Sequence, residues 1–218
     1  MALIDARRLM SGPRWTITAI LVGNLIPVAG VLFLGWDAAQ ILMLYWVENV
    51  VVGLLTLPRI LAAQRLPTGA SGGRLGHAIS TGVFFVIHYG VFCMGHLVFA
   101  MALAADFVAA EGGDGEVWDR TFGDPAFLWA VLATAVLLVV SQARDWWLKG
   151  AWREASPTLE MFKPYGRIFV LHLTVLFGAW LLLVLKAPAW VVLILCLGKA
   201  GLELAGAVLT GRIDPRRL

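Results

Sequence analysis

The chain has 218 residues, of which 60% are apolar and 14% are charged, with a formal net charge of +3. This balance excludes an ordinary soluble domain and is typical of a protein that crosses a membrane several times. The charge is too small to indicate a nucleic-acid-binding protein, and the two cysteines, which have no short Cys-x-x-Cys spacing, do not indicate a disulfide framework.

Six stretches of the chain are long and apolar enough for transmembrane helices, each of which needs about 20 mostly apolar residues. We therefore predict an all-α, polytopic helical bundle that forms one transmembrane domain over residues 1–218. The first stretch is longer than the apolar core of a signal peptide, so we expect it to be retained. In chain order, the predicted spans cover approximately 15–35, 38–62, 78–104, 125–143, 167–187 and 189–211.

The connections between these spans differ in length and composition. A short break at Gly35-Trp36-Asp37 predicts that the first two spans form a helical hairpin, and Pro125 suits the first turn of the fourth span. Segment 144–166 mixes basic residues with tryptophans, which is typical of an amphipathic helix along the cytoplasmic interface. We therefore expect this segment not to cross the membrane.

The distribution of charge predicts the orientation of the bundle. With six spans, the N-terminal segment, the loop after the second span, segment 144–166 and the C-terminal tail lie on one side, and all four are rich in arginine or lysine. The loop over residues 105–124 lies on the other side and carries six acidic residues against one arginine. Because basic loops stay cytoplasmic, we predict that both termini are cytoplasmic.

Three histidines and two glutamates fall well inside the predicted spans. An ionisable group at this depth costs several kcal/mol, roughly 2.5–3.5 on insertion scales, and usually faces the interior of a bundle, where it has a function. From a rise of about 1.5 Å per residue, we expect His88, His172 and Glu203 to share one level. Glu48 and His96 are expected near or above the middle of the bilayer.

Neighbouring polar residues extend this predicted site. Tyr45, Glu48 and Asn49 stand at i, i+3 and i+4 on one helix face, so the tyrosine and the asparagine are candidate partners of the glutamate. Lys199 and Glu203 stand at i and i+4 and can form an ion pair that only fixes packing. Each histidine can likewise form an interhelical hydrogen bond that has no other role.

The motif in the second predicted span carries a resemblance to a known family. The runs that carry it are Tyr45-Trp46-Val47-Glu48-Asn49, His88-Tyr89-Gly90 and Gly95-His96, and His172 and the segment from Gly198-Lys199 to Glu203 also fit. The chain resembles an uncharacterised bacterial family of multi-pass membrane proteins, a domain of unknown function. The resemblance implies a bacterial inner-membrane protein and implies no activity. The chain matches neither the paired-glutamate pattern of CAAX-type intramembrane proteases nor a His-Glu-x-x-His zinc helix.

An intramembrane metal site is the leading interpretation of these residues. Imidazole nitrogens and carboxylate oxygens suit a divalent metal, and we favour zinc over iron or manganese. If one coordination position stays open, a bound water could be activated for hydrolysis of a lipid or a peptide bond, with Glu48 as the candidate general base. The predicted ligands are His88, His172 and Glu203, with His96 and Glu48 as further ligands, and with Tyr45, Asn49 and Lys199 as the residues that support them.

Three other functions stay open at this point. The same residues at staggered depths could relay protons in a proton- or ion-coupled transporter, because histidine titrates near neutral pH. Two histidines from different spans could bind a b-type haem, and the polar groups could also only specify packing in a non-catalytic assembly protein. Membrane lipids are the expected partners, and the residues leave open a homo-oligomer, the identity of any substrate, and whether the protein is an enzyme.

Overall fold

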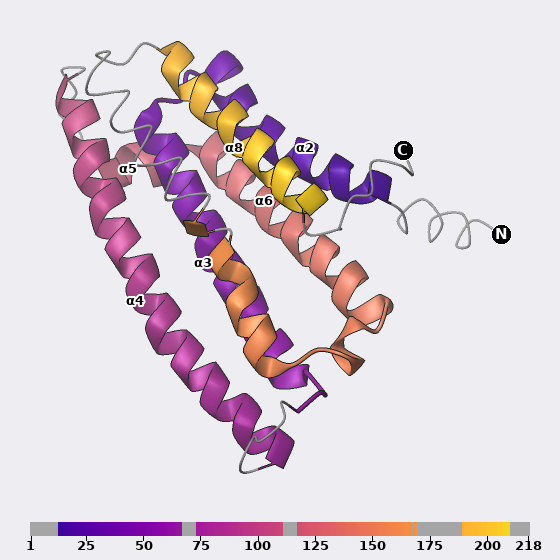
Figure 1. Ribbon diagram of the computed structural model, residues 1–218. Helices are drawn as coiled ribbons and strands as arrows, with labels where there is room; N and C mark the ends of the chain where they lie inside the picture. The colour runs from indigo at the N-terminus through magenta and orange to yellow at the C-terminus, as the bar shows by residue number, and fades with distance from the viewer. Residues whose placement is uncertain (1–12, 67–72, 111–116, 167, 170–188, 210–218) are drawn as a thin grey trace. The chain divides into compact units, whose positions relative to one another are not determined.

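The computed structural model describes residues 13–66, 73–110, 117–166, 168–169 and 189–209. All regular structure in these residues is helical, which confirms the all-α prediction for them (Figure 1). Contacts between the helices divide the chain into two compact units, Met1–Asp37 with Val170–Leu218, and Ala38–Phe169. One transmembrane domain over residues 1–218 stays a prediction.

In the first unit, helix α2 (Pro13–Phe33) packs against helix α8 (Ala189–Leu209). The end of α2 is fixed by Gly35, whose φ of 70° lies in the left-handed region that favours glycine. The backbone N–H groups of Leu34 and Trp36 then both donate to the carbonyl oxygen of Gly30, at 3.1 and 3.0 Å. The buried Trp36 ring folds back onto α2, where a Cβ at Gly30 would lie 2.0 Å from it. The predicted break after the first span is therefore confirmed.

In the second unit, helix α3 (Ala38–Ala62) packs against helix α4 (Gly73–Ala110) on one side and against helix α6 (Pro125–Gln142) on another. A short helix, α5 (Val117–Phe122), contacts all three. Helix α6 begins as the sequence indicates, with Pro125 in its first turn and with the Asp124 side chain accepting a hydrogen bond from the backbone N–H of Ala126.

The prediction of one amphipathic helix over residues 144–166 is wrong. Helix α6 continues into a π-helix, η1 (Ala143–Leu148), and Gly150, two residues beyond its end, lies in the left-handed region (φ 71°). A 3₁₀ turn, η2 (Ala151–Arg153), follows, and residues 157–166 form a separate helix, here called the 157–166 helix. The segment breaks at Gly150 because this glycine reverses the chain. Residues 152–155 then bind the end of the α3 segment, because the backbone N–H groups of Gln64 and Arg65 donate to the carbonyl oxygens of Trp152 and Ala155.

Four helices in the described residues are long and apolar enough to cross a membrane, by length and composition. They are Thr16–Phe33, Ala38–Ala62, Gly73–Ala105 and Pro125–Leu148. The predicted span 167–187 lies outside the described residues, and α8 is a helix of 21 residues that is not among the four. The described residues thus give four candidate spans where the sequence predicted six.

A buried apolar cluster holds the second unit together. Ile60 of α3, Phe85 and Tyr89 of α4, and Met161 of the 157–166 helix all belong to it, together with Ile168. The Tyr89 ring fits into this cluster because Gly53 leaves room for it, since a Cβ at this glycine would lie 2.4 Å from the ring. The 157–166 helix therefore packs against both α3 and α4.

We expect Gly53→Ala to destabilise the protein by about 1–3 kcal/mol relative to Gly90→Ala, because the new methyl group overpacks the Tyr89 ring. Gly90 is the matched control, since it lies in α4 and a Cβ there would meet no atom within 4 Å in the described part of the chain. Both substitutions gain the same helix propensity. Thermal unfolding of the two variants in detergent measures the difference, and equal melting temperatures would contradict the tight contact.

Candidate functional site

Two hydrogen bonds fix the register of α3 against α4. The Tyr89 hydroxyl donates to the backbone carbonyl of Asn49 at 2.9 Å, and the Trp46 indole Nε1–H donates to the backbone carbonyl of Cys93 at 2.9 Å. The two helices are therefore antiparallel, and Glu48 lies along α3 between the two crossing points. Glu48 is half-buried, so the structure places a carboxylate at the level of the middle of α4.

His96 has a defined ring orientation on α4. Its Nδ1 lies 2.6 Å from the backbone carbonyl oxygen of Phe92, and a carbonyl oxygen only accepts hydrogen bonds. Nδ1 must therefore carry the proton, which puts the lone pair of the neutral imidazole on Nε2. His96 follows Tyr89 by seven positions and Cys93 by three, so it lies on the side of α4 that faces α3.

His88 forms a pair with a residue that the sequence did not single out. Its Nδ1 lies 2.6 Å from the hydroxyl of Tyr165, at the end of the 157–166 helix. The imidazole is exposed, and it packs between the rings of Phe84 and Phe92, with both centroid distances 5.2 Å. Burial, and to a smaller extent the neighbouring Cys93 thiol, raises the pKa of Tyr165, so the phenol stays protonated.

Glu203 belongs to the first unit, whereas Glu48, His88 and His96 belong to the second. One oxygen of the Glu203 carboxylate lies 3.0 Å from the ammonium of Lys199, and the other accepts a hydrogen bond from the side-chain amide of Asn24 at 2.8 Å. Lys199 also lies 3.5 Å from the Asn24 side-chain oxygen, and both side chains are buried. The ion pair that the i,i+4 spacing allowed is therefore present.

Only some of the predicted metal ligands lie within the described residues. His172 lies outside the described residues. Tyr45 and Asn49 are buried in α3, and their predicted role beside Glu48 stays a prediction. In the described residues, no group of three or more histidine, cysteine, aspartate or glutamate side chains is placed to hold a metal ion, so the predicted ligand set stays a prediction.

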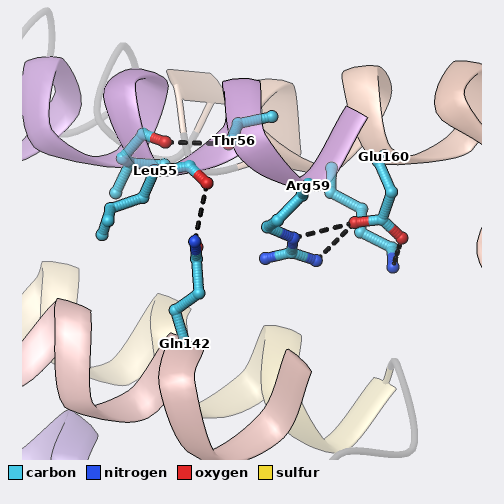
Figure 2. Close-up of polar contacts among 7 residues, drawn as sticks. Leu55, Thr56, Arg59, Gln142 and Glu160 are labelled. Atoms are coloured by element: carbon cyan, nitrogen blue, oxygen red, sulfur yellow. Dashed lines mark hydrogen bonds and ion pairs between the residues drawn. The ribbon is translucent and has the colours of Figure 1, made fainter. Parts of the chain in front are cut away.

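A second polar cluster lies at the C-terminal end of α3, and sequence reasoning missed it. The carboxylate of Glu160, only 1% exposed, accepts hydrogen bonds from Arg59 and Lys163, with the Arg59 Nε at 3.0 Å (Figure 2). The Arg59 guanidinium also lies 4.8 Å from the centre of the Trp146 ring. The sequence offered one local sign, the i,i+3 spacing of Glu160 and Lys163, but Arg59 stands 101 positions before Glu160.

Beside this cluster, α6 is tied to α3 by a side chain that binds the backbone. Pro58 interrupts the hydrogen-bond ladder of α3 because it has no N–H. Just before the proline, Gln142 of α6 donates its side-chain amide to the carbonyl oxygen of Leu55 at 2.7 Å (Figure 2). Neighbouring side chains commonly satisfy backbone groups near a proline in apolar helices, so Gln142 both stabilises the proline-containing turn and positions the π-helix that follows it.

Comparison with known proteins supports the resemblance that the motif indicated. The family of unknown function DUF6498 matches residues 6–217, which is nearly the whole chain. The chain belongs to this family. No curated protein and no solved structure matches the chain. Membership in DUF6498 assigns no activity, so a function for this DUF6498 protein has to be argued from its own contacts.

We expect Glu160→Gln to lower the free energy of unfolding by about 2–4 kcal/mol, because the buried amide leaves two cations without their carboxylate. Lys163→Gln should cost less than about 1 kcal/mol, since the Lys163 side chain is 56% exposed and the Arg59 pair remains. Thermal unfolding in detergent compares the two variants. A Glu160→Gln protein as stable as Lys163→Gln would show that the buried pair contributes nothing.

Proposed function

We propose that this DUF6498 protein is a bacterial inner-membrane protein with six spans and cytoplasmic termini. The exposed side of α4 supports the proposed membrane location. Large apolar side chains are exposed along it, such as Val83, Ile87, Val91 and Val98. The five-turn apolar stretches of the four candidate spans are compatible with the same environment. The two further spans are the predicted 167–187 and α8, and the basic segments favour the cytoplasmic side for both termini.

Reporter fusions test this topology. A green fluorescent protein fused after Leu218 should fluoresce, and alkaline phosphatase inserted in the loop over 105–124 should be active, because only the latter is expected outside the cytoplasm. The reverse fusions are the controls. Phosphatase activity at the C-terminus would contradict an even number of spans.

Within the second unit, we propose a divalent metal site, with zinc favoured over iron or manganese, at the α3–α4 contact. The observation that carries it is the hydrogen bond between Nδ1 of His96 and the carbonyl of Phe92. Histidines that bind metals almost always donate their other ring N–H to a carbonyl or carboxylate, which fixes the tautomer and the direction of the ligand nitrogen. The Nε2 of His96 then has the form that a metal ligand needs.

The other proposed ligands follow from spacing along the helices. Glu48 supplies a carboxylate on α3, where it can act as a ligand or as a general base for a metal-bound water in a hydrolase. His172, which the sequence also predicted as a ligand, lies outside the described residues. On α4, His88 contacts the hydroxyl of Tyr165. His88 is a further ligand in this proposal. The carboxylate of Glu203 is already bound by Lys199 and Asn24, so we propose that it fixes packing instead.

One contact favours a second function, a proton- or ion-coupled transporter. The hydrogen bond between His88 and Tyr165 joins an imidazole to a hydroxyl, and both groups can donate and accept hydrogen bonds. Proton relays in membrane proteins are chains of such ionisable side chains, in which histidine is common. Metal-free protein that carries a pH-dependent flux in proteoliposomes would favour the relay over the metal site.

Metal analysis of purified protein tests the leading proposal. We expect the wild type to bind about one equivalent of zinc, and His96→Ala to lower the affinity at least about tenfold. His77→Ala is the matched control, since His77 lies near the start of the same helix and binds the Thr158 hydroxyl at 3.0 Å. Wild-type protein without bound metal after zinc loading, or equal losses in the two variants, would contradict the proposed site.

A further inference from the structure

The cluster around Glu160 carries a surplus of positive charge. Arg59 and Lys163 share this one carboxylate, so two cations and one anion leave a net charge of +1. Both cations also contact the same aromatic ring, that of Trp146, at 4.8 Å for Arg59 and 5.9 Å for Lys163. The Arg59 side chain is 24% exposed and that of Lys163 is 56% exposed, so the surplus charge reaches the surface.

The neighbouring π-helix repeats this imbalance. Arg144 and Lys149 share the carboxylate of Asp145, with the Arg144 Nε at 2.7 Å and the Lys149 Nζ at 2.9 Å. Here too, two cations share one carboxylate. Trp146, whose ring both cations of the first cluster contact, lies in this π-helix.

Large apolar side chains surround these charges. On the 157–166 helix, Leu159 and Phe162 are 65% and 59% exposed, and they share a helix face with Lys163 at spacings i, i+3 and i+4. On the π-helix, Leu148 is 71% exposed and Trp147 is also exposed. These apolar side chains would make no favourable contact with a small soluble anion. A phospholipid complements both parts of the surface, because it carries an anionic headgroup and apolar chains on one molecule.

We propose that the surface formed by Arg59, Leu159, Phe162 and Lys163, above the buried Trp146 ring, binds the headgroup of an anionic phospholipid. The inference rests on the membrane location proposed above. The phosphodiester would lie against the Lys163 ammonium and the exposed edge of the Arg59 guanidinium, and the acyl chains would pack against Leu159 and Phe162. Basic sites at the cytoplasmic ends of spans attract anionic lipids because each nearby Lys or Arg adds to the attraction.

Lipid titration of the purified full chain in detergent tests the proposal. Phosphatidylglycerol should raise the melting temperature or bind in native mass spectra, and phosphatidylcholine should do neither at the same concentration. Lys163→Gln should weaken phosphatidylglycerol binding about fivefold, because it removes the more exposed cation. Arg153→Gln is the matched control: Arg153 also lies over a tryptophan ring, that of Trp152, but outside the proposed surface.

Several outcomes would overturn the assignment. Equal binding of the two lipids, or equal losses in the two variants, would show that the surface does not select an anionic headgroup. If glycerol 3-phosphate alone produced the full stabilisation, the ligand would be a soluble phosphate and not a lipid. A wrong membrane topology would appear separately in the reporter fusions, so a failed lipid titration with the expected topology counts against this surface alone.

Discussion

The close contact between α3 and α4 is the constraint on which the second unit depends. Gly53 lets the Tyr89 ring approach the α3 backbone, and the Tyr89 hydroxyl then binds the carbonyl of Asn49. This contact sets the antiparallel register, so it also decides which parts of the two helices lie side by side. Both the half-buried Glu48 and the α3-facing position of His96 follow from it. The 157–166 helix packs against the same contact through Met161 and so brings Tyr165 to His88.

Polar side chains in these apolar helices are bound in two different ways. Some bind the backbone of a neighbouring element or of their own helix, as Trp46, Gln142 and His96 do with carbonyl oxygens. Others bind each other across elements, as Lys199 and Glu203 do with Asn24, and as Glu160 does with its two cations. In a medium without water an unpaired polar group costs several kcal/mol. These contacts therefore fix helix positions even where they have no further role.

Hydropathy predicted the helices far better than it predicted the site. The bounds of α3 were predicted correctly, because a glycine-containing break precedes a continuous apolar run. Segment 144–166 was assigned wrongly, because the composition of a whole segment hides the single glycine, Gly150, that divides it.

Depth along a span can be estimated from the helical rise, but the direction in which a side chain points depends on contacts with other helices. Glu203 is an example: the i,i+4 spacing indicated its ion pair with Lys199, but not its hydrogen bond with Asn24, 179 positions away. The same limit hid Glu160, whose partner Arg59 is distant in the sequence.

In the proposed lipid site, the charges at the end of α3 have two roles, to stabilise the fold and to bind a headgroup. Glu160 is buried, so its carboxylate needs a permanently bound cation. Arg59 can serve as this cation because its planar guanidinium also packs on the Trp146 ring. Lys163 is the more exposed cation, and an exposed ion pair is worth little. Lys163 can therefore turn toward an external anion while Arg59 keeps the carboxylate neutralised. Stability then depends mainly on Arg59, whereas Lys163 contributes mainly to the proposed headgroup binding.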